Sequence, residues 1–209
     1  MNRDDAFLLA ADAVLALVEQ PDVAARWSGP SALPRLGVGG LAVHLGNQVL
    51  RAAQAVTSDP GDLPVLADAD EHYARSAWPT AAPEDPVNDR SGDETAALDG
   101  PEALHERITA HRDAFRDAVA DGTARDVVPV SWAGWALRRE DFLLTRMVEV
   151  VVHCDDLAAS VGLDTPTFPD AVFEPVRDLL VRLAVARHGQ SRVVAALTRR
   201  ERAEPIHAF

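Results

Sequence analysis

The chain lacks lysine and has a single cysteine, so all 20 basic residues among its 209 are arginines. One cysteine cannot form an intrachain disulfide, which is typical of proteins from a reducing compartment. No apolar run approaches the roughly 18 residues that a membrane-spanning helix needs. The amino-terminal residues do not resemble a secretory signal. We therefore expect a cytoplasmic protein without membrane segments.

Positive charge and aromatic residues are also scarce. The chain has 33 acidic residues, a formal net charge of −13 and a pI of about 4.8. A surface this acidic repels phosphate groups, so we expect no nucleic-acid partner and no binding to anionic membranes. Aromatic residues make up 5% of the chain and hydrophobic residues 47%, so Ala, Leu and Val must build the core. Abundant Ala and Leu favour helices.

Apolar residues that recur every three or four positions predict long helices. We expect bundle helices over residues 4–19, 38–57, 101–120 and 139–160, and further helices over 170–187 and 191–200. Pro21 should end the first helix, and Gly162 should end the fourth. Three glycines near residue 38 should weaken the first turn of the second helix.

The segments between these helices complete the predicted architecture. Residues 58–100, rich in Pro, Asp, Gly and Ala, should form a long connection with one short helix around 66–76. Residues 127–135 should form a short extended crossing. The prediction is an all-α protein: a four-helix bundle with one long crossover over residues 1–165, and a short C-terminal helical extension over 166–209.

The predicted helix 139–160 carries polar residues among valines and leucines. Glu149 and His153 are four residues apart, so they lie on one face, and Arg146 and Asp156 fall on the same stripe. Buried charges are costly unless they are paired or bind a metal, and a carboxylate with an imidazole suits zinc or a similar ion. His44, on the second predicted helix, is the best candidate for a third ligand. Three ligands would leave a position open, as in catalytic sites.

Other residues with the same chemistry have simpler interpretations. We interpret His72 as part of the polar connection, His105 as solvent-facing and His111 as a core histidine. Cys154 points about 100° away from the metal stripe, which favours a small buried apolar residue over a nucleophile. Arg146 would either orient an anionic substrate or pair with an acidic residue of its own helix. The candidate ligands could also form a buried polar network without metal.

Two segments resemble signatures of the mycothiol-dependent maleylpyruvate isomerase family, which belongs to the DinB-like metal-binding bundles. Residues 27–49 contain the loop Pro-Ser-Ala-Leu-Pro followed by Gly-Gly-Leu-Ala-Val-His-Leu. Residues 143–157 contain an Arg-x-x-Glu-x-x-x-His-x-Asp-Asp-Leu run. The resemblance implies that His44, Glu149 and His153 are metal ligands.

The resemblance also implies a function. It implies a divalent metal, with zinc ahead of nickel or iron, and mycothiol as the low-molecular-weight thiol co-substrate. A metal-bound thiolate would attack a small electrophile in a transferase or isomerase reaction, with Arg146 and Asp156 as the catalytic-site residues that orient the groups around the metal. Apart from the resemblance, we expect the long connection over residues 58–100 to determine substrate specificity, because binding residues often lie on loops. The alternative is a non-catalytic metal-containing bundle that binds a small molecule or a partner protein, as a monomer or homodimer.

Overall fold

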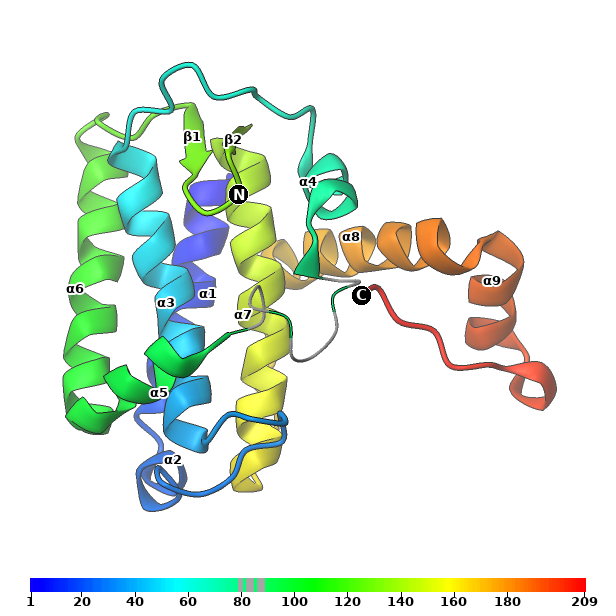
Figure 1. Cartoon of the computed structure of the whole chain (residues 1–209), viewed down its shortest axis with the longest axis horizontal. Helices are drawn as coiled ribbons and strands as arrows, with labels where there is room; N and C mark the ends of the chain where they lie inside the picture. The colour runs from blue at the N-terminus through cyan, green and yellow to red at the C-terminus, as the bar shows by residue number, and fades with distance from the viewer. Residues whose placement is uncertain (79–80, 82–84, 86–88) are drawn as a thin grey trace.

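The computed structural model describes residues 1–78, 81, 85 and 89–209, and in these residues the chain is mostly helical. Four long helices lie side by side as a bundle (Figure 1), in which α3 and α1 each pack against both α6 and α7. They are α1 (Arg3–Val18), α3 (Val38–Thr57), α6 (Gly100–Ala120) and α7 (Arg139–Val161). The predicted all-α bundle is confirmed, and no described helix is long and apolar enough to cross a membrane.

The ends of these helices follow local chemistry. The side chain of Asn2 accepts a hydrogen bond from the backbone N–H of Asp5 and so caps α1. Gly162 follows α7 in the left-handed conformation, as predicted. Pro21 was expected only to end the first helix, but it also begins the short helix α2 (Pro21–Ala25). A proline is tolerated there because the first turn of a helix does not use its backbone N–H groups.

The long connection from α3 to α6 contains more helix than predicted. It includes the expected short helix as α4 (Ala69–Arg75), and also α5 (Ser91–Ala96) and the 3-10 turn η3 (Ala97–Asp99). Helix α5 packs across the first half of α3 (Figure 1). Residues 79–80, 82–84 and 86–88 of the predicted connection lie outside the described residues. The connection therefore places two short helices against the bundle rather than a structureless loop.

The predicted extended crossing is a hairpin. Strands β1 (Val127–Val130) and β2 (Trp135–Arg138) pair antiparallel, with Val127 opposite Arg138. The turn between them contains Gly134 at a φ of 77°, a conformation that glycine adopts without strain. The single crossing over residues 127–135 was therefore wrong, because the chain reverses at residues 131–134 instead of continuing.

The glycines of α3 allow close packing. A Cβ atom at Gly39 would lie 2.8 Å from the Trp27 ring, and one at Gly46 would lie 2.8 Å from the side chain of Ile108 on α6. Both distances are shorter than van der Waals contact, so a larger residue would push the neighbouring groups apart. The cost of glycine in the helix is thus balanced by a closer approach of α3 to its neighbours.

The C-terminal residues form α8 (Asp170–His188), α9 (Gln190–Thr198) and the 3-10 turn η4 (Arg200–Arg202). Helix α8 packs against α7, α1 and α4, whereas α9 lies away from the bundle (Figure 1). Arg182 on α8 pairs with Asp70 on α4 at 2.8 Å. Phe209 returns to the bundle and packs on Tyr73 and Trp78. The division into a bundle over 1–165 and an extension over 166–209 stays a prediction.

Candidate metal centre

The polar stripe of α7 faces α3. Glu149 and His153 are partly buried, each with 17% of its side chain exposed. Met147, Val148 and Val150, which flank Glu149 in the sequence and point to other sides of the helix, are buried. The spacing of four residues places the Glu149 carboxylate beside the His153 ring, with 3.5 Å between Oε2 and Nε2.

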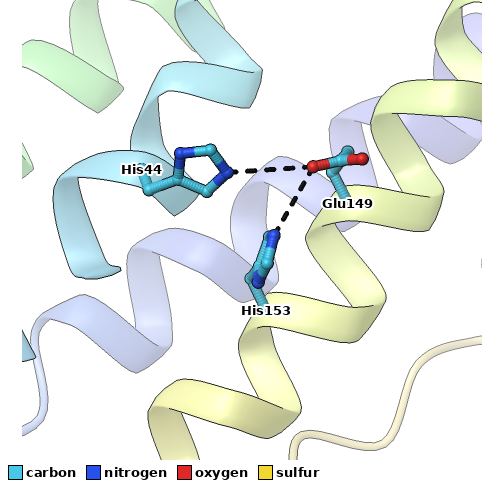
Figure 2. Close-up of side chains that lie close together, drawn as sticks. All are labelled: His44, Glu149 and His153. Carbon is cyan, nitrogen blue, oxygen red and sulfur yellow. Dashed lines mark ion pairs between the residues drawn. The ribbon is translucent and has the colours of Figure 1, made fainter. Parts of the chain in front are cut away.

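His44 on α3 completes the group (Figure 2). It is 4% exposed, and its Nε2 lies 3.8 Å from Oε2 of Glu149. The ligand atoms of His44, Glu149 and His153 all lie within 4.8 Å of one another, and no other such group of His, Cys, Asp and Glu occurs among the described residues. The distances of 3.5 and 3.8 Å exceed those of good hydrogen bonds. They are close to the roughly 3.4 Å that separates two ligands of a tetrahedral zinc ion.

A carboxylate contacts each histidine at Nδ1, the ring nitrogen that does not face Glu149. His44 Nδ1 lies 2.9 Å from Oδ2 of Asp93, and His153 Nδ1 lies 2.9 Å from Oδ2 of Asp156. Asn47 donates a hydrogen bond to the second oxygen of Asp93 at 2.8 Å. Because both Nδ1 atoms are engaged, both Nε2 atoms face Glu149. Metal-ligating histidines commonly have such carboxylate partners.

The surroundings of Glu149 and His153 shift the pKa values of both groups strongly. Burial alone would raise the pKa of Glu149, but its contacts with His153 and His44 and the charge of Arg146 hold it well below the usual range. Burial alone would lower the pKa of His153, but Asp156 and Glu149 raise it to about 9. The carboxylate is therefore ionised at neutral pH, and a metal would have to displace a proton from His153.

Arg146 lies at the buried end of the same stripe and is 3% exposed. It donates a hydrogen bond from Nη1 to Oε1 of Gln48 at 2.7 Å and one from Nε to the hydroxyl of Thr145 at 3.2 Å. Among the described residues it forms no ion pair with an acidic residue of α7, although its charge lowers the pKa of Glu149. Of the two alternatives from the sequence, a direct ion pair is absent.

The interpretation of His72 as part of a polar connection was wrong, because this residue is buried. It lies on α4, is 3% exposed, and accepts a hydrogen bond at Nδ1 from Trp135 Nε1 at 3.1 Å. Burial, and then the charge of Arg146, lower its pKa to about 4. The sequence carried a signal for this buried face, because the apolar residues Leu66, Ala69 and Tyr73 recur at helical spacing, and all three are buried.

Tyr73 lies next to His72 and is 5% exposed. Burial, and then the charge of Glu149, raise the pKa of its hydroxyl. That hydroxyl is buried and has no hydrogen-bond partner among the described residues. Helix α4 therefore contributes a neutral imidazole and a phenol close enough to feel the charge of Glu149, which sequence reasoning missed.

Cys154 follows His153 but faces the core. It is fully buried, and burial raises the pKa of its thiol to about 12. A protonated, buried thiol is a poor nucleophile, which agrees with its interpretation as a small apolar residue. His105 and His111 lie on α6, and neither joins the group around Glu149.

A cavity of about 430 Å³ lies beside the second half of α7. Asp156 is the only residue of the metal centre among those that line it, so this cavity is separate from the space between the ligand atoms. Its other lining residues are Val151, Val152, Asp155, Thr165, Pro166, Thr167, Phe168 and Phe173.

The fold and the site together define a helical bundle with a candidate metal centre of two histidines and one glutamate. Residues 7–158 match the family model of the mycothiol maleylpyruvate isomerase N-terminal domain. The match covers most of the chain, which therefore belongs to this family. No curated protein and no solved structure matches the chain. The family suggested by the sequence is thereby confirmed.

Proposed function

We propose that the protein binds one divalent metal through His44, Glu149 and His153, and that the site holds a low-molecular-weight thiol as a thiolate that attacks a small electrophile. The observation that carries this proposal is the convergence of the three groups from α3 and α7, with the Nδ1 atom of each histidine hydrogen-bonded to a carboxylate oxygen. A buried polar network without metal would instead close the gaps of 3.5 and 3.8 Å to hydrogen-bond length.

Zinc is the metal that this set of groups suits best. Two histidines and one glutamate are a frequent set in catalytic zinc sites, where a fourth position stays open. Nickel or iron are the alternatives, because the affinity order alone does not select the metal. The bound ion would supply the positive charge that keeps a thiol deprotonated at neutral pH.

The chain's own residues would position the reactants. Asp93 and Asp156 fix the rings of His44 and His153, so that Nε2 of each faces the metal. Arg146 places a fixed positive charge at the buried end of the site, where it favours an anionic group. The thiolate sulfur would form a bond to an electrophilic carbon. A leaving group then departs with its electron pair in a transfer, or the thiolate is expelled again in an isomerisation.

Mycothiol is the thiol that family membership suggests. The substrate would be a small electrophile, and parts of the connection over 58–100 would select it, since α4 and α5 both approach the metal centre. A cytoplasmic location and a monomeric or homodimeric state remain predictions.

A cobalt-substituted protein tests the thiol step. Adding mycothiol should produce a thiolate-to-cobalt charge-transfer band, and calorimetry in two buffers of different ionisation enthalpy should report release of a proton. Glutathione and cysteine serve as comparison thiols, and His153→Ala serves as the control without a metal site. If no thiol changes the cobalt spectrum at millimolar concentration, the transferase or isomerase proposal fails. A non-catalytic bundle, with the metal bracing α3 against α7, then becomes the better account.

A further inference from the structure

Helix α3 presents a second cation near the metal centre. His44, Gln48 and Arg51 are spaced by four and three residues, so they follow one face of the helix. The Cζ atom of Arg51 lies 4.8 Å from the centre of the Trp132 ring. The Cζ atom of Arg146, on α7, lies 5.0 Å from the same ring. Trp132 thus contacts two guanidinium groups from two different helices.

These two cations lack an anionic partner among the described residues, because neither forms an ion pair with a carboxylate. Burial, and then the positive charge of Arg146, lower the pKa of Arg51. The charges of Glu149 and Asp93 act in the opposite direction but do not restore the pKa, so the protein relieves the repulsion between the two guanidinium groups only in part. A divalent metal at the neighbouring centre would add positive charge, and an anion bound here would offset it.

The hydrogen-bonding groups available also suit an anion. Arg146 uses Nη1 and Nε on Gln48 and Thr145, which leaves Nη2 without a hydrogen-bond partner among the described residues. Among the described residues Arg51 contacts the Trp132 ring and makes no hydrogen bond, so its guanidinium N–H groups are available to a ligand. A planar guanidinium can bind the two oxygens of a carboxylate together. Trp132 lies in the turn between β1 and β2 and is 50% exposed, so solvent reaches this arrangement from the side of the hairpin turn.

We propose that Arg51, with Arg146 and Trp132, forms a carboxylate-binding subsite beside the metal centre, and that it selects electrophiles that carry a carboxylate. The role in selection rests on the proposed function, whereas the binding of a carboxylate does not. The competing explanation is that both arginines stack on Trp132 only to stabilise the hairpin turn, since such contacts also occur without ligands.

Benzoate and its neutral amide, benzamide, test binding directly. Titration calorimetry at low salt should detect benzoate with the wild-type protein, both metal-free and metal-loaded, and benzamide should bind more weakly. Arg51→Gln should weaken benzoate binding by about tenfold in both forms, because it removes a charged hydrogen-bond partner, and should leave benzamide unchanged. Arg187→Gln removes the same charge from the exposed end of α8 and should have no effect.

Benzoate that binds to the metal-free protein cannot be held by the metal, so this form tests binding by the arginines alone. The proposal is overturned if the wild-type protein shows no saturable binding of benzoate. It is also overturned if Arg51→Gln leaves benzoate binding unchanged, or if it weakens benzoate and benzamide equally.

Iodoacetate and iodoacetamide test the selection of electrophiles. The thiolate sulfur displaces iodide from either reagent, so one C–S bond forms as one C–I bond breaks, and the reagents differ in charge. In a Cys154→Ala background, Arg51→Gln should lower the ratio of kcat/KM for iodoacetate over iodoacetamide by about tenfold. An unchanged ratio contradicts selection by Arg51. If neither reagent reacts but benzoate still binds through Arg51, the proposed function fails and the carboxylate subsite stands.

Discussion

At the scale of single residues, the face of α7 on which a side chain lies distinguishes the candidate metal ligands from residues that only pack in the core. His153 faces α3, and its neighbour Cys154 faces the core and is fully buried. We predict that His153→Ala abolishes metal binding and any thiol-transfer activity, since it removes one of three ligands. Cys154→Ala should leave both largely intact. Metal analysis and a thiol-conjugation assay measure the two effects. Loss of activity in Cys154→Ala alone would mean that the nucleophile is the protein thiol.

His72 should make the stability of the protein depend on pH. Its pKa is about 4 in the folded protein and about 6.5 in the unfolded chain, so the unfolded chain takes up the proton first. The free energy of unfolding should therefore fall as the pH drops from 6.5 to 4, by about 3 kcal/mol from this residue. Trp135, Tyr73, Arg146 and Glu149 are the groups that act on its ring.

Urea unfolding at pH 7 and pH 4 measures this effect, with His72→Gln as the comparison. Glutamine can still accept a hydrogen bond from Trp135 but has no group that titrates in this range. The variant should lose less stability than the wild-type protein over the same interval. Equal losses in the two proteins would show that His72 is not held in its neutral form.

Sequence reasoning could find residues whose role depends on local spacing. Glu149 and His153 are neighbours on one helix, so their pairing follows from helix geometry alone. Asp93 could not be found in this way, because its partner His44 is 49 residues away and the contact exists only after α5 docks on α3. Arg51 was missed for a similar reason, since its contact with Trp132 joins a helix to the turn of a hairpin.

At the scale of elements, helix α5 connects the α3–α6 crossover to the metal centre. Asp93 orients His44, and Glu94 accepts a hydrogen bond at 2.6 Å from the backbone N–H of Gly37, just before α3. We predict that Asp93→Asn weakens metal binding by about 10- to 100-fold, because the ring of His44 loses its charged partner. Competition with a chelating dye measures the affinity.

Asp99→Asn provides the matched control for this prediction. Asp99 is exposed at the end of η3 and has the same chemistry, but it does not contact a histidine. Its substitution should leave the metal affinity unchanged. Equal affinities for the Asp93→Asn variant and the wild-type protein would contradict the role of α5 at the site.

The long helices were predictable, and the short elements much less so. Helix α3 has the predicted bounds because its apolar residues recur over five turns and a serine in extended conformation follows it. Helix α5 has only six residues, none of them buried, so its sequence carries no periodic apolar signal. The hairpin was predicted as one crossing because each of its two strands has only four residues. Strands this short give too little alternation of apolar and polar residues to mark the turn between them.

At the scale of the whole molecule, α8 shares the core of the bundle. Its residues Val172, Val176 and Leu179 are fully buried in the same cluster as the residues of α7. We predict that Leu179→Ala lowers the free energy of unfolding of the whole chain by about 3 kcal/mol, because it leaves a cavity in a continuous core. Val181→Ala, at an exposed position on the same helix, should cost much less.

Chemical denaturation followed by fluorescence measures this effect in a background where Trp27 is the only tryptophan left, since Trp27 packs against α3 far along the chain from α8. A single transition that shifts in Leu179→Ala is expected. A Trp27 transition that does not move in the variant would mean that residues 166–209 fold independently of the bundle.

The net charge of the whole molecule affects how its metal content must be measured. With a net charge of −13 the protein attracts cations non-specifically. Specific binding is therefore shown only by metal that is lost when one of the three ligands is replaced. Elemental analysis of protein purified without a histidine tag and dialysed at moderate salt is the most direct test. We predict about one equivalent of divalent metal per chain, zinc foremost, and almost none in His153→Ala. Less than about 0.2 equivalents of every transition metal in the wild-type protein would contradict the account.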